Sequence, residues 1–99
     1  MIKEAPKAVT PVQIKVLTAM WAAYGQNVMP ADRASYRRLA DMTAIATTGG
    51  VLDKLRVLRA KGYIESRGGS QVRPEAWVIR GGALSRAKKM VRDVSRRQE

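Results

Sequence analysis

Residues 47–67 read TTGGVLDKLRVLRAKGYIESR, and their hydrophobic period changes at Gly62. Before this glycine, apolar side chains recur four and three residues apart, the spacing of one helix face: Val51, Leu55 and Leu58. Thr47 or Thr48 can cap the start of this helix, and Gly62 suits its C-terminal cap. The stretch therefore predicts a helix that runs to Lys61.

After Gly62 the pattern is that of strands. Tyr63 to Arg67 forms a predicted short strand, Gly68-Gly69-Ser70 a turn, and Ala76 to Ile79 a returning strand. Pro74 would interrupt a central strand, so it marks the loop or the start of the second strand. We expect a β-hairpin directly after the helix.

Upstream, a helix is predicted from Thr10-Pro11-Val12-Gln13, a capping-box sequence with proline at the first helical position. Its expected end is near Tyr24-Gly25. Its apolar stripe comprises Val12, Val16, Ala19, Met20 and Ala23.

A second helix is expected over Ala34 to Asp41. A loop from Gln26 to Asp32, containing Pro30, precedes it, and a connection from Met42 to Ala46 follows it. Its predicted inward residues are Tyr36, Leu39 and Ala40. Four aromatic residues are also assigned to the core: Trp21, Tyr24, Tyr63 and Trp77.

The C-terminal segment from Ala83 to Arg97 predicts a basic amphipathic helix that begins after Gly81-Gly82. Its apolar seam is Leu84, Ala87, Val91 and Val94. This seam could pack on the first helix or pair with a second copy in a homodimer, or the helix could lie along DNA. The predicted organisation is an arm over residues 1–9, a domain over 10–80 and this helix within 81–99.

The chain has 99 residues and a net charge of +11, and it contains neither His nor Cys. Disulfides, thiolate or imidazole metal sites and His-based catalysis are therefore excluded. The longest apolar run is the six residues Ala19–Tyr24, too short to span a membrane, and no secretory signal is expected. A cytoplasmic, and if DNA-bound nucleoid-associated, protein is expected, with a polyanion as partner.

An enzyme is not expected, and no metal or cofactor is implied. The acidic residues are dispersed along the chain, with no local pair spaced to share a proton or hold a metal. No glycine-rich phosphate cradle of the Walker or dinucleotide type occurs, because Gly68-Gly69 follows the wrong kind of element.

Three helices followed by a hairpin are the order of a winged helix-turn-helix. The predicted fold class is mainly α with a small β-hairpin: a three-helix core, a wing and an added C-terminal helix. Residues 10–79 also resemble the N-terminal DNA-binding domain of the LexA repressor. The residues that carry the resemblance are Thr10, Gln13, Val16, Met29, Pro30, Arg33, Ala34, Leu55, Leu58, Lys61, Gly62, Ile64 and Glu65.

The ending L-x-x-L-x-x-x-G-x-I is also similar to that of MarR-like regulators. The resemblance to LexA implies that the third helix enters the major groove of DNA and that Asp53 is an acidic recognition residue. Two departures stand out. The turn before the third helix is about three residues longer, and the chain has no room for a self-cleaving protease domain.

The predicted DNA contacts lie on the third helix, at its start and on the wing. They are Arg33, Thr47, Thr48, Gly49, Gly50, Asp53, Lys54, Arg56, Arg67, Ser70, Gln71 and Arg73. Threonine hydroxyls and free helix N–H groups bind phosphate, glycines allow close backbone approach, and a carboxylate accepts from the cytosine amino group.

Each contact has a plainer alternative. The threonines could serve only as an N-cap, and Gly49-Gly50 could end the turn rather than open the helix. Asp53 could pair with Arg56, three residues further along the same face. The Gly-rich tip near Arg67 and Arg73 could be an ordinary polar turn.

We therefore expect a small, repressor-like transcriptional regulator that binds double-stranded DNA sequence-specifically. Two alternatives are a winged-helix protein-interaction module and a structural nucleic-acid-binding protein without sequence preference, because fold does not fix function.

Overall fold

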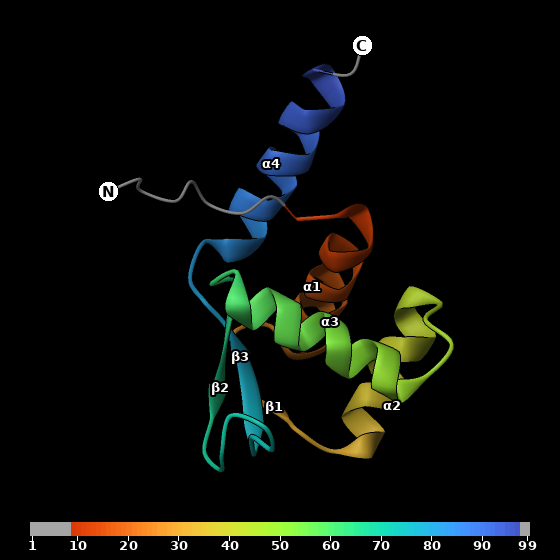
Figure 1. Cartoon of the computed structure of the whole chain (residues 1–99), viewed down its shortest axis with the longest axis vertical. Coiled ribbons are helices and arrows are strands. Elements are labelled where there is room, and N and C mark those ends of the chain that lie inside the picture. Colours follow the sequence, from red (N-terminus) through yellow and green to blue (C-terminus); the bar gives the residue numbers. More distant parts are fainter. Residues whose placement is uncertain (1–8, 98–99) are drawn as a thin grey trace.

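The computed structural model describes residues 9–97, with side chains for residues 9–92 (Figure 1). Within these residues the chain is mainly helical, with four helices and one small antiparallel sheet. The elements are α1 Pro11–Tyr24, β1 Met29–Pro30, α2 Arg33–Thr43, α3 Thr48–Ala60, β2 Ile64–Arg67, β3 Ala76–Ile79 and α4 Ala83–Arg97. The predicted arm lies outside the described residues except for Val9, which is buried in the core.

Side-chain caps fix where the first three helices begin. In α1 the Gln13 N–H donates to Thr10 Oγ1 (3.2 Å), and the Thr10 N–H donates to Gln13 Oε1 (3.1 Å), so the predicted capping box is confirmed. Asp32 caps α2, and Thr47 caps α3 by accepting from the Gly50 N–H (2.9 Å). Gly49 and Gly50 therefore lie inside the first turn of α3, not in the turn before it.

The sheet has the strand order β1-β3-β2, and both neighbours of β3 run antiparallel to it. The hairpin prediction is confirmed: β3 spans the predicted residues, and β2 begins at Ile64, one residue after the predicted start at Tyr63. The prediction of a loop from Gln26 to Asp32 is wrong at Met29–Pro30, which pair with Trp77 and Ala76. Two residues are too few to show a strand period, and Pro30 fits an edge strand because only an outer strand has N–H positions that need no partner.

The helix α2 is longer than expected at both ends. It takes in Arg33 at its start, and Met42 and Thr43 at its end, so the predicted connection is reduced to the residues before Thr47. The Thr43 hydroxyl donates to the Leu39 carbonyl oxygen (2.7 Å), which fastens a β-branched residue to the last turn.

The buried face of α1 keeps Val16, Ala19 and Met20 of the predicted stripe and takes in Gln13 and Leu17, which were not predicted. Val12 and Trp21 are each 42% exposed, so the prediction that these two residues belong to the core is wrong. Gln13, by contrast, is buried, with 7% of its surface exposed. Gln13 accepts there from the Lys61 ammonium (2.7 Å between Oε1 and Nζ) as well as from Thr10. Gln13 is thus buried because its polar atoms have hydrogen-bond partners, although the hydrophobic pattern places the adjacent Val12 in the core.

Most other predicted core residues are buried. Trp77 and Tyr63 are 0% and 1% exposed, as expected, while Tyr24 and Tyr36 are half-buried. The largest fully buried side chains are Trp77, Tyr63, Leu17, Met20, Met29, Leu39, Leu55, Leu58 and Ile64.

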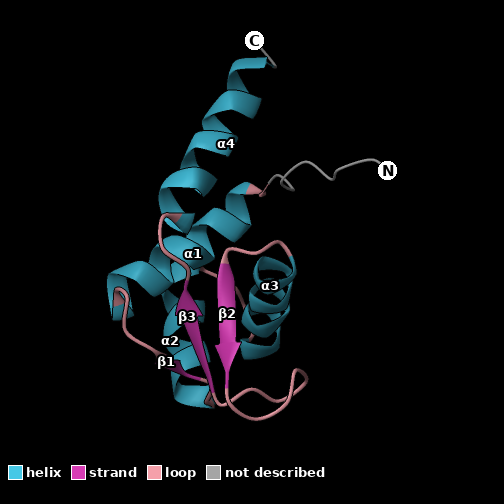
Figure 2. Cartoon of the chain, turned by 90° about the vertical axis from the view of Figure 1, so that its left-hand side faces the viewer, coloured by secondary structure: helices cyan, strands magenta, loops and turns pink. Residues whose placement is uncertain are grey.

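The helix α4 begins and ends at the predicted residues and packs on α1. Ala83 and Ala87 are fully buried there, and Arg86 lies over the Tyr63 ring, with Cζ 5.0 Å from its centroid. Leu84 and Val91 of the predicted seam are half-buried, and the side chain of Val94 lies outside the described residues. Figures 1 and 2 show α4 extending from one end of the molecule, opposite the loop that joins β2 to β3. Among the described helices, none is long and apolar enough to cross a membrane.

Replacement of Ala44 by glycine should stabilise the protein. Ala44 ends α2 in the left-handed region at φ +60°, and it is the one non-glycine residue with positive φ in the described chain. A glycine at this position removes the Cβ strain, so Ala44→Gly should raise the free energy of unfolding by about 1 kcal/mol. Urea denaturation measures the change. Ala46→Gly, at a neighbouring residue without positive φ, is the matched control and should give no gain; an equal response from both variants would contradict the prediction.

A second prediction concerns pH. The Ser35 N–H donates to Asp32 Oδ1 (2.8 Å) and lowers the pKa of that carboxyl below its ordinary value of 3.8. Its stabilising contribution is complete above pH 3.8 and is lost as the pH falls through the lowered pKa. Asp32→Asn keeps the cap but does not titrate. Unfolding curves measured between pH 2 and 6 should therefore show a smaller acid loss in Asp32→Asn than in the wild type; identical slopes would contradict the assignment.

Candidate nucleic-acid interface

The exposed face of α3 carries three of the predicted contact residues. Gly49, Asp53 and Arg56 are exposed there, opposite the buried Val51 and Leu55. Asp53 and Arg56, both in the described part of the chain, do not form the ion pair that their spacing allows. The carboxylate of Asp53 is therefore presented to solvent on a surface that has a glycine on one side and an arginine on the other.

The two glycines of α3 have different surroundings. A Cβ on Gly49 would meet only Thr47 Oγ1, at 4.0 Å. A Cβ on Gly50 would lie 2.9 Å from Ile45 Cγ2 and 3.2 Å from Thr47 Oγ1. Gly50 is thus required by packing within the protein, whereas nothing in the described chain requires a glycine at position 49.

A polar hollow of about 290 Å³ lies between α2 and the start of α3. It brings together Arg33, Thr47 and Thr48, which the sequence predicted as contacts, and it adds Arg37. Sequence reasoning missed Arg37, although it lies one helical turn after Arg33 and therefore on the same face. Asp41 also lines the hollow and reduces its positive charge. Lys54, the remaining predicted contact of α3, is half-exposed.

The hairpin loop, residues 68–75, is closed by hydrogen bonds within itself. The Ser70 N–H donates to the Arg73 carbonyl oxygen (3.2 Å), and the Arg73 N–H donates to Ser70 Oγ (3.0 Å). Gly68 and Gly69 both have positive φ, and a Cβ on Gly69 would collide with the Arg73 carbonyl oxygen. The glycines are therefore needed for the turn itself.

Two arginines of α3 hold this loop. Arg59 Nη1 donates to the Gln71 carbonyl oxygen (2.9 Å) and to Ser66 Oγ (3.2 Å), and Arg56 Nη2 donates to the Val72 carbonyl oxygen (3.4 Å). Sequence reasoning missed Arg59, whose only signal is its position three residues after Arg56 on the flank of α3. Of the predicted contacts, Arg56 thus has a partner within the protein.

Between α3 and the hairpin loop lies a cleft of about 440 Å³. Its lining residues are Ala31, Tyr36, Leu52, Arg56, Val72, Arg73 and Pro74. Val72 is 69% exposed, so an apolar side chain stands at the rim of a cleft that also presents two guanidinium groups.

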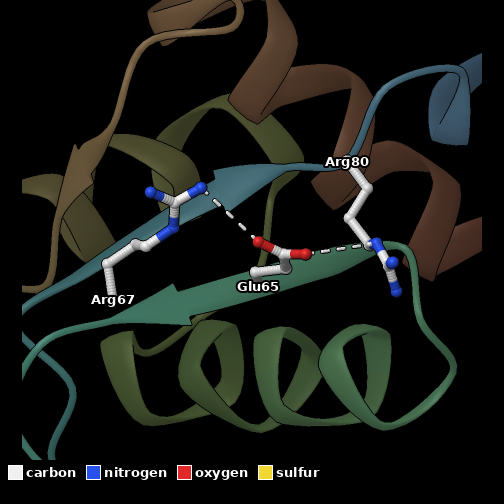
Figure 3. A network of polar contacts seen from close by, with 3 residues as sticks. All are labelled: Glu65, Arg67 and Arg80. Carbon is white, nitrogen blue, oxygen red and sulfur yellow. Dashed lines mark ion pairs between the residues drawn. The ribbon is translucent and has the colours of Figure 1, made fainter.

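The last predicted cation of the hairpin, Arg67, shares a carboxylate with Arg80. Glu65 forms ion pairs with both, from Oε2 to Arg67 Nη2 (3.5 Å) and from Oε1 to Arg80 Nε (3.3 Å), as Figure 3 shows. All three side chains are largely exposed, so these pairs contribute little to stability. Because Ser66 points to α3, its neighbours Glu65 and Arg67 lie on the opposite face of the sheet. Arg67 is therefore not part of the cleft, and Glu65 offsets part of its charge.

The surface around α3 thus joins an exposed helix face to two flanking hollows, each with two arginines. Comparison of the chain with protein-family models, with curated proteins and with solved structures finds no match.

Proposed function

We propose that this chain binds double-stranded DNA sequence-specifically, as a small transcriptional regulator of the winged helix-turn-helix type. The observation that carries the proposal is the exposed face of α3. It holds an open glycine and an unpaired carboxylate between two hollows that contain Arg33 and Arg37 on one side and Arg56 and Arg73 on the other. Such a face suits base contacts in the middle and phosphate contacts at its borders.

The order of elements supports the same proposal. Two helices lead into α3, the hairpin β2–β3 follows it directly, and β1 adds to the far side of β3. In a winged helix-turn-helix this order puts the recognition helix in the major groove and the hairpin, or wing, on the backbone or in the minor groove. The LexA-like residues from Thr10 to Glu65 point the same way.

In this proposal the α3 face reads bases through Asp53, which would accept from a cytosine amino group. The hollow at the start of α3 receives phosphate through Arg33 and the first N–H groups of the helix, those of Thr48 and Gly49, because the Gly50 N–H already donates to Thr47. Arg73 of the wing binds a second phosphate across the cleft.

The test is selection of bound duplexes from a random-sequence pool, followed by affinity measurements on the enriched site at several salt concentrations. We expect an enriched motif and an affinity that falls steeply with salt, with a slope of about −0.9 in log K against log salt for each phosphate neutralised. A salt slope without an enriched motif would mark a nucleic-acid-binding protein that does not read sequence. If no DNA bound at physiological salt, the proposal would be refuted.

Gly49→Ala separates folding from binding. The space around position 49 accepts a methyl group, and alanine in the first turn of a helix is favoured over glycine, so stability should rise by about 0.5–1 kcal/mol. The same methyl group stands on the proposed contact face, so affinity for the selected site should fall. Gly50→Ala is the control inside the protein, because it meets Ile45 and should gain no stability. Unchanged affinity in Gly49→Ala would exclude close approach of DNA at this residue.

Arg73→Ala and Asp53→Asn should have different effects. Loss of a phosphate contact weakens binding to every sequence alike and reduces the salt slope by about 0.9. Substitution of Asp53 should instead change which base is preferred at one position, a discrimination of about 1–3 kcal/mol. Repeating the selection with each variant measures both effects. A changed motif in Arg73→Ala, or an unchanged one in Asp53→Asn, would contradict the assigned roles.

A further inference from the structure

Arg59 connects α3 to the sheet and to the hairpin loop through two hydrogen bonds and a contact with an aromatic ring. Its Nη1 donates to the Gln71 carbonyl oxygen at 2.9 Å and to Ser66 Oγ at 3.2 Å. Its guanidinium carbon lies 5.3 Å from the centroid of the Trp77 ring. One side chain of α3 therefore contacts β2, β3 and the hairpin loop together.

These contacts determine where the loop stands relative to α3. Trp77 is fully buried in β3, so the ring beneath the guanidinium is a fixed support. From that support the Arg59 side chain reaches the carbonyl oxygen of Gln71 in the loop. The next residue, Val72, accepts at its carbonyl oxygen from Arg56 (3.4 Å). Arg59 and Arg56 thus tie two successive residues of the loop to α3, beside the cleft that Leu52 and Val72 line.

We infer that Arg59 is a positioning residue for DNA binding. It holds the wing at the distance from α3 at which the helix and Arg73 can contact the same duplex. The inference rests on the proposed function for its DNA readout, and it assigns to Arg59 no contact with DNA. Arg59 is half-buried and its guanidinium already has partners, whereas Arg73 is exposed.

The geometry requires arginine rather than lysine. A planar guanidinium can stack on an aromatic ring and donate in its own plane to two acceptors at the same time. A lysine ammonium keeps the charge and can reach one acceptor, but it does not combine stacking with the two-way hydrogen bond. Arg59→Lys therefore tests geometry at constant charge, and Arg59→Met keeps the apolar stem without the guanidinium.

The experiment is a double-mutant cycle between Arg59→Lys and Arg73→Ala, read as affinity for the selected DNA site. In the wild-type background, Arg73→Ala should weaken binding about tenfold, the loss of one hydrogen bond to a charged group. In the Arg59→Lys background the wing is held less firmly, because of the arginine contacts to the loop only the one from Arg56 to Val72 is left, so the same change should cost less than about twofold. A residue that only stabilises the fold would leave the two effects additive, and additivity would overturn the inference.

A second measurement uses no DNA. Amide hydrogen exchange should become faster over residues 70–75 in both Arg59→Lys and Arg59→Met, while the amides that pair β1 with β3 keep their protection. Ala60→Ser, an exposed change at the adjacent position of α3, serves as the control and should leave the loop unchanged. Unaltered loop exchange in the Arg59 variants would refute the positioning role even if the wild type binds DNA. Faster loop exchange in a protein that binds no DNA would refute the proposed function while supporting the role of Arg59 in holding the loop.

Discussion

The arrangement of α2, α3 and the sheet depends on the contacts of one side chain, the indole of Trp77. It is fully buried on β3, the central strand, and its backbone pairs with Met29 of β1 and Ser66 of β2. Its Nε1–H donates to the Tyr36 hydroxyl of α2 (3.0 Å), and its ring supports the guanidinium of Arg59 from α3. A buried tryptophan needs a partner for its N–H, and here that partner also sets how α2 and the sheet meet. The Trp77 side chain therefore sets the positions of α2, α3 and the hairpin relative to one another.

The sequence predicted the elements well because their signals are local. The Thr10–Gln13 capping box, the Val51–Leu58 stripe and Gly62 each act within a few residues. The structure has the corresponding boundaries, except that α3 ends at Ala60 and has Lys61 rather than Gly62 as its C-cap. The bounds of α4 were equally readable, whereas of the described residues of its predicted seam Ala87 is fully buried and Leu84 and Val91 are half-buried. Local patterns could not predict which of two adjacent residues of a helix is buried. Gln13 is buried in place of Val12 because Lys61, 48 residues away, provides a partner.

The candidate site was predictable in its residue types and not in its internal contacts. The exposed Gly49 and Asp53 follow from helix periodicity, whereas the role of Arg59 depends on carbonyl groups of a loop that only the folded chain brings near. Arg56 and Arg67 looked alike as exposed cations; one holds the loop and the other shares Glu65 with Arg80. Positive charge is also found at the other end of the molecule, where α4 exposes Arg86, Lys88, Lys89 and Arg92. The net charge of +11 therefore combines at least two separate surfaces.

The two-residue strand β1 has a consequence for behaviour at high concentration. It forms one outer edge of the sheet, and Pro30 offers no N–H there to a further strand. Exposed strand edges are templates for intermolecular pairing, and a short edge with proline blocks that growth. Copies of this chain at high concentration would therefore meet no open β-edge on this side of the sheet. Pro30, which in the sequence indicates a loop, thus protects that side of the sheet from edge-to-edge aggregation.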